Sequence, residues 1–199
     1  MLARAAPEFR GRYPARHGRS GLGLAPLLAL ALLCGAAPAT ADSLKPWTAD
    51  RPPPLALDRL DGAPVALDAV RGQPVVVHFF ATWCAPCIEE MASLNAFAAT
   101  PGAPAILAVN VGEVDARVRN FFTGRPVSFP VLLDRDRAAM KAWKIEGLPT
   151  SFVLDRELKA ALKTEEPLDW ASPAVAAALA ALSKAEPPIQ PTKDTGETP

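Results

Sequence analysis

Two cysteines lie two residues apart in the segment Trp83-Cys84-Ala85-Pro86-Cys87, directly after an apolar run at 75–80. The chain of 199 residues has only three cysteines. A Cys-x-x-Cys pair that a strand delivers to the start of a helix favours thiol–disulfide exchange. Exchange requires a thiolate, which unpaired N–H groups and the helix dipole stabilise at a helix N-terminus. We therefore predict that Cys84 attacks a substrate disulfide and that Cys87 resolves the mixed disulfide.

Two other uses of such a pair, a structural disulfide and a metal site, must be weighed. A structural clip would close too short a loop to constrain the unfolded chain strongly. A structural zinc site needs four ligands. The only histidine after the N-terminal segment is His78, and no second Cys-x-x-Cys follows. We therefore predict no metal and no cofactor other than a redox-active disulfide between Cys84 and Cys87.

The N-terminal segment has the composition of an export signal. Residues 1–20 hold five arginines and one acid, an apolar run follows at 21–37, and Ala39-Thr40-Ala41 comes next. A basic start, a short apolar middle and an Ala-x-Ala end are typical of a secretory signal peptide. We expect cleavage after Ala41, which would leave a protein that is periplasmic or otherwise exported. An uncleaved N-terminal anchor is the alternative.

Cleavage would change both the charge and the cysteine content of the chain. The full sequence has a formal net charge of zero, so losing five arginines and one glutamate leaves four negative charges. Nucleic acid is then an unsuitable partner, because phosphate binding needs clustered Lys and Arg. Cys34 would leave with the signal, so Cys84 and Cys87 would be the only thiols. In an oxidising compartment such a pair is oxidised unless something reduces it.

Apolar periodicity and turn residues predict the elements that position the pair. We expect a linker at 42–54, a domain at 55–184 and a disordered tail at 185–199. The expected strands lie at 55–57, 65–67, 75–80, 105–111, 129–133, 150–154 and 158–162, the first two forming a hairpin around Asp61-Gly62. The expected helical segments lie at 68–72, 85–99, 114–122, 137–143 and 174–184. Strands that alternate with helices in this way predict an α/β sandwich around a mixed sheet.

The chain resembles the thioredoxin superfamily in two segments, 83–87 after an apolar strand and Gly147-Leu148-Pro149-Thr150 about sixty residues later. Four further segments are similar to the exported, membrane-associated thiol reductases of the TlpA/ResA type: 60–62, 71–72, 81–83 and 108–111. The resemblance covers roughly residues 55–182. It implies a thioredoxin-like three-layer sandwich with a central mixed sheet and an added N-terminal hairpin.

The resemblance also implies roles for individual residues. Pro149 matches a cis-proline that faces the disulfide and leaves the backbone of Leu148 free to pair with an extended substrate. We place Trp83 and Pro86 on the same substrate-binding side. Glu90 matches a buried acid that could exchange a proton with Cys87. The alternative for Glu90 is a solvated surface side chain.

His78 lies six residues before Cys84, where thioredoxins have a buried acid. A buried imidazole at this position could relay protons or shift the pKa of a sulfur. A half-buried histidine that is hydrogen-bonded to the backbone is an equally good interpretation of the sequence. We therefore include His78 among the candidate catalytic residues and leave its role open.

These observations predict a monomeric, exported thiol–disulfide oxidoreductase that reduces client proteins. The family resemblance implies apocytochrome c or copper-site cysteines as clients, with electrons from a membrane thiol donor because the periplasm has no reducing pool. A dithiol oxidase is the same chemistry in reverse. A thiol peroxidase would need a threonine where Ala81 stands. A non-catalytic copper- or haem-handling module is the remaining alternative, although no histidine follows His78.

Overall fold

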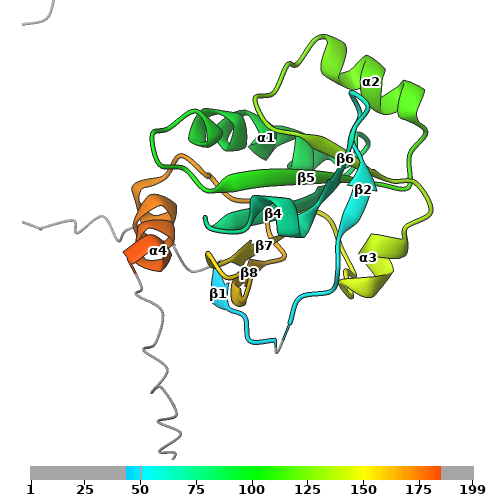
Figure 1. Cartoon of the computed structure of the whole chain (residues 1–199). Coiled ribbons are helices and arrows are strands. Elements are labelled where there is room, and N and C mark those ends of the chain that lie inside the picture. Colours follow the sequence, from blue (N-terminus) through cyan, green and yellow to red (C-terminus); the bar gives the residue numbers. More distant parts are fainter. Residues whose placement is uncertain (1–43, 50, 185–199) are drawn as a thin grey trace, which may run out of the picture. The chain divides into compact units, whose positions relative to one another are not determined.

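A computed structural model describes residues 44–49 and 51–184 of the chain (Figure 1). The predicted signal peptide at 1–41 and the predicted disordered tail at 185–199 lie outside the described residues. Within the described part, no helix has the length and apolar character needed to cross a membrane.

A six-stranded mixed sheet forms the centre of the fold, with β4 as one of its inner strands (Figure 1). The strands follow the order β1 (Lys45–Pro46), β8 (Ala160–Thr164), β7 (Thr150–Leu154), β4 (Val75–Phe80), β5 (Ala105–Val111) and β6 (Val131–Asp134). β4 pairs in parallel with β5 and antiparallel with β7. All six residues of β4 are buried, as its β-branched and aromatic composition predicts.

The predicted hairpin is present as β2 (Ala56–Asp58) and β3 (Pro64–Ala66), which pair antiparallel. Gly62 lies in its turn with φ 127°, a conformation that side-chain-bearing residues rarely adopt. The hairpin is joined to β6, because the backbone N–H of Leu60 donates to the carbonyl of Val131 at 2.8 Å. A short 3₁₀ helix, η1 (Leu67–Val70), then leads to β4.

Helices cover both faces of the sheet. They are α1 (Ala85–Ala98), α2 (Asp115–Thr123), α3 (Ala138–Ala142) and α4 (Pro173–Lys184). Side chains alternate along β4, so Val76 and Phe80 pack in one hydrophobic cluster with α1, α2 and α4. Val77 and Phe79 point the other way and pack with residues of α3 and its following turn. The predicted α/β sandwich is confirmed.

Part of the segment predicted as a linker at 42–54 pairs with the sheet. Lys45 and Pro46 form β1, which pairs with β8 at the sheet edge, and the N–H of Trp47 donates to Ala161 at 2.9 Å. The ring of Trp47 lies 4.6 Å from that of Phe152 between centroids. A two-residue strand is too short to show alternation, and proline is tolerated at a sheet edge. Packing of one aromatic side chain, which the sequence does not reveal, therefore orders this segment.

Truncation of this side chain by Trp47→Ala should lower the free energy of unfolding by about 2 kcal/mol, because a half-buried aromatic contact is lost. Denaturant unfolding measures the change. The exposed neighbour provides a control, Thr48→Ala, which should change stability by less than about 0.5 kcal/mol. Equal stability of the Trp47 variant and the parent would show that the segment is only loosely attached.

Candidate active site

Cys84 and Cys87 form a disulfide at the N-terminus of α1. Cys84 is the N-cap residue, and its sulfur accepts the backbone N–H of Cys87 at 3.4 Å. Pro86 lies in the first turn, where proline needs no N–H partner. Cys84 is 5% exposed and Cys87 is completely buried. The geometry thus presents one sulfur to an incoming group and directs a helical N–H at that same sulfur, which favours its thiolate.

The predicted substrate-side residues come from two loops at the same end of the sheet. The β4–β7 pairing ends with Phe79 opposite Thr150, so the cis peptide bond Leu148–Pro149 lies alongside the loop that carries the cysteines. Trp83 is 61% exposed. It shares with Leu148 the lining of a cavity of about 360 Å³, whose other lining residues are Val111, Arg137, Met140, Glu146 and Gly147.

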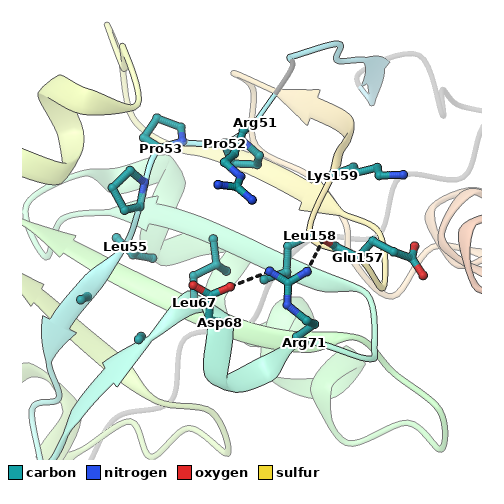
Figure 2. Close-up of a pocket in the computed structure, with 13 residues that line it drawn as sticks. Arg51, Pro52, Pro53, Leu55, Leu67, Asp68, Arg71, Glu157, Leu158 and Lys159 are labelled. Atoms are coloured by element: carbon teal, nitrogen blue, oxygen red, sulfur yellow. Dashed lines mark hydrogen bonds and ion pairs between the residues drawn. The ribbon is translucent and has the colours of Figure 1, made fainter.

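A larger cavity of about 620 Å³ lies at the opposite end of the sheet, where β4 begins and β7 ends. Figure 2 shows Arg71 in its wall, donating to the Asp68 carboxylate at 2.6 Å and to the carbonyl of Glu157 at 2.8 Å. This cavity does not contain either cysteine. Its size therefore says nothing about the redox site.

Glu113 fixes the loop between β4 and α1. Its buried carboxylate accepts hydrogen bonds from the backbone N–H and the hydroxyl of Thr82, each at 2.6 Å, and from Nδ2 of Asn110 at 2.7 Å. Thr82 lies two residues before Cys84, so these hydrogen bonds hold the loop that carries Cys84. The sequence analysis did not identify Glu113. The available signal was Asn110, a polar residue within the apolar strand β5.

His78 and Glu90 meet beneath the disulfide. Both are buried, and Nε2 of His78 lies 3.3 Å from Oε1 of Glu90. The other carboxylate oxygen of Glu90 accepts the N–H of Leu168 at 2.7 Å, and Nδ1 of His78 lies 2.8 Å from Oγ of Ser151. Glu90 is therefore not a solvated surface glutamate, and His78 contacts side chains rather than backbone. Cys87 lies one helical turn before Glu90, on the same buried face of α1.

Burial controls the protonation of this pair. It lowers the pKa of His78 to about 3 and raises the pKa of Glu90 to about 7, the latter against the stabilising N–H of Leu168 and the nearby indole of Trp170. The indole nitrogen does not reach hydrogen-bond geometry, so Leu168 is the more effective partner. Between about pH 3 and pH 7 the favoured state is therefore a neutral imidazole beside a neutral carboxylic acid. A proton on Oε1 of Glu90 would join two atoms that otherwise lack hydrogen-bond partners.

The two shifted pKa values should affect stability in opposite directions. In Glu90→Gln only the His78 shift remains, so stability should rise with pH from about 3 to 6.5, because the unfolded state binds the extra proton there. In His78→Asn only the Glu90 shift remains. Stability should then fall by about 2–3 kcal/mol from pH 4.5 to 7, because the folded state binds the extra proton.

Urea unfolding at a series of pH values measures both slopes against the parent protein, so that all other titrating groups cancel. The same pH dependence in both variants would contradict the assignment of a neutral pair.

Glu113→Ala should lower the free energy of unfolding by about 2–3 kcal/mol, since it leaves buried donors of Thr82 and Asn110 unpaired. It should also slow disulfide exchange at Cys84, because the preceding loop loses its anchor. Stopped-flow exchange and denaturant unfolding measure the two effects. Glu89→Ala on the exposed face of α1 is the control and should change neither. A normal rate of disulfide exchange in the Glu113 variant would show that Glu113 does not position Cys84.

The described residues contain no group of three His, Cys, Asp or Glu side chains close enough to hold a metal ion.

A model described as the AhpC/TSA family matches residues 48–161. The thiol-disulfide oxidoreductase ResA of Bacillus subtilis (strain 168) is 37% identical over 110 residues, which are 54% of this chain and 61% of that protein. The chain thus spans less than two thirds of the length of this relative.

Two solved structures show the same fold. One is a candidate thiol:disulfide interchange protein DsbE from Chlorobium tepidum, with a TM-score of 0.63 and 26% identity over 69% of this chain and 99% of that one. The other is the exposed lipoprotein thioredoxin Etrx1 from Streptococcus pneumoniae strain TIGR4, with a TM-score of 0.55 and 21% identity over 67% and 100% of the two chains. The predicted thioredoxin-like fold is confirmed.

Proposed function

Because this chain belongs to the AhpC/TSA family, we propose that it is an exported thiol–disulfide oxidoreductase that reduces disulfides of client proteins. The observation that carries the proposal is the Cys84–Cys87 disulfide at the start of α1, with Cys84 the more accessible sulfur. The relative ResA is named a thiol-disulfide oxidoreductase, which supports the same chemistry.

The reaction starts from the reduced pair. The Cys84 thiolate attacks one client sulfur, a bond forms between them, and the second client sulfur leaves as a thiolate that takes up a proton. Cys87 then attacks Cys84, which restores the intramolecular disulfide and releases the first client sulfur. Two electrons pass from the protein to the client in each cycle.

Cys87 must lose its proton inside the protein because it has no contact with solvent. Glu90 lies one turn further along α1, and burial raises the pKa of its carboxyl group to about 7, so its ionised form is a suitable acceptor. Among the described residues, His78 contacts this carboxyl group and makes no hydrogen bond to either sulfur. We assign Glu90 the proton transfer and His78 the positioning of that group.

The substrate-binding side in this proposal consists of Trp83, Pro86, Leu148 and Pro149. Among the described residues, the backbone of Leu148 has no recorded hydrogen-bond partner, and β7 begins only at Thr150. An extended client segment could pair with this free backbone as an added strand. Trp83 offers an exposed aromatic surface next to it.

The predicted export signal, with the oxidising compartment that it would imply, supports action as a reductant that receives electrons from a membrane thiol donor. In this proposal the protein is a monomer, released in the periplasm or held at the membrane by its N-terminal segment. The clients are proteins with oxidised cysteine pairs, such as apocytochrome c or copper-site proteins.

The test combines trapping with a reduction potential. Cys87→Ala should form a stable mixed disulfide with a model client such as insulin, because resolution is lost, whereas Cys84→Ala should form none. The potential of the pair should lie nearer to about −270 mV than to the −120 mV of strong dithiol oxidants. A value near −120 mV would indicate the oxidase, and absence of any mixed disulfide would contradict the function.

The remaining alternatives have their own signatures. Ala81 is completely buried and has no hydroxyl group with which a thiol peroxidase could bind peroxide three residues before the cysteine. Direct turnover of peroxide by the protein would nevertheless support the thiol peroxidase alternative. Tight copper binding by the reduced protein, together with negligible insulin reduction, would indicate a metal-handling module instead.

A further inference from the structure

The cavity beside Trp83 has an apolar lining with two charged residues. Val111, Met140 and Leu148 supply apolar surface, whereas Arg137 and Glu146 are exposed and charged. This cavity adjoins both loops of the redox site, since Trp83 precedes Cys84 and Leu148 forms the cis peptide bond with Pro149. A client side chain that flanks the attacked cysteine could enter it.

The backbone around Arg137 is shaped to hold its side chain over a neighbouring turn. Arg137 has φ 62°, which is uncommon for a residue with a side chain. Its side chain lies against Gly112, the residue after β5, where φ is 68°. A Cβ atom at Gly112 would collide with Nε of Arg137. Glycine is thus favoured here by its backbone conformation, because the flexible end of the arginine side chain can shift to relieve the collision.

Arg137 has no recorded ion pair within the described chain, in contrast to Arg135, which contacts Asp115 at 2.6 Å and Asp58 at 2.7 Å. The acidic residues close to Arg137 or to Gly112 in the sequence have other partners, whereas Glu146 shares the lining of the cavity. Asp134 accepts the N–H groups of Ala139 and Met140. Glu113 accepts donors from Thr82 and Asn110, and Asp136 accepts the N–H of Ala138. The Arg137 guanidinium therefore lies beside the cavity and makes no ion pair within the described residues.

We propose that Arg137 is a specificity-determining residue that binds a carboxylate of the client, so that the preferred substrate is a disulfide with an acidic side chain close to the attacked cysteine. This inference rests on the proposed function. A guanidinium group binds carboxylates through two parallel hydrogen bonds and stays charged at every relevant pH. The client strand would pair along Leu148, and its acidic side chain would then reach the cavity that Arg137 lines. Glu146, in the same lining, weakens this attraction.

The test uses small peptides with an intramolecular disulfide, identical except for Glu, Gln or Lys at each position that flanks a cysteine. The reduced full-length protein is mixed with each peptide, and the second-order rate of reduction is measured. At one flanking position, the Glu peptide should react about three- to tenfold faster than the Gln peptide. The Lys peptide should react more slowly than either of them. Added salt should reduce this ratio, because a partly exposed ion pair is screened.

Variants assign the preference to one residue. Arg137→Gln should bring the Glu-to-Gln rate ratio close to one, and Arg137→Lys should leave an intermediate ratio, since the charge remains without the planar fork. Glu146→Gln should raise the ratio. Arg156→Gln is the matched control, because this exposed arginine follows β7 at the other end of the sheet, and it should leave the ratio unchanged.

The inference fails if the parent protein shows no preference at any position, or if Arg137→Gln slows all three peptides equally. Both results are distinct from failure of the proposed function, in which no peptide would be reduced at all.

Discussion

Burial of β4 on both faces is the constraint on which the rest of the site depends. The strand is an inner member of the sheet, none of its side chains reaches solvent, and Ala81 after it is also buried. The chain reaches the surface at Trp83, and Cys84 then caps the start of α1. The position of Cys84 therefore requires that this short loop be held in place. Glu113 meets this requirement from the end of β5, the strand beside β4, by accepting two hydrogen bonds from Thr82.

The same burial decides the state of the proton site. A charged pair of His78 and Glu90 would lose hydration on both groups, and attraction at 3.3 Å need not compensate for that loss. A neutral imidazole beside a neutral acid avoids the cost and still allows one proton to lie between the two atoms. Glu90 can therefore gain or lose a proton near neutral pH. His78 stays neutral there, so one of its ring nitrogens remains a hydrogen-bond acceptor. A buried base of this kind suits Cys87, which has no access to water.

The elements that carry strong local patterns could be predicted from the sequence, and those that depend on contacts between distant segments could not. The apolar run of β4 and the helix after Cys84 are local signals, and both lie where expected. β1 depends on Trp47 packing against Phe152, more than one hundred residues away in the chain, so the segment looked like a linker. His78 and Glu90 were each identified as candidates, but their contact follows from the packing of α1 on β4. Glu113 escaped notice because a glutamate after a strand is usually solvated, and only the fold places Thr82 and Asn110 around it.

The arrangement of charges around the disulfide separates the chemistry from the choice of client. On the buried side, the carboxyl group of Glu90 and the imidazole of His78 are enclosed away from solvent. On the exposed side, the side chains of Arg137 and Glu146 line the same cavity as Trp83. A change in the exposed pair can therefore alter which disulfide is bound while the proton site beneath the cysteines stays the same. The turn after β5 joins the two sides, because the side chain of Arg137 lies against Gly112 while the next residue, Glu113, reaches inward to hold the loop that carries Cys84.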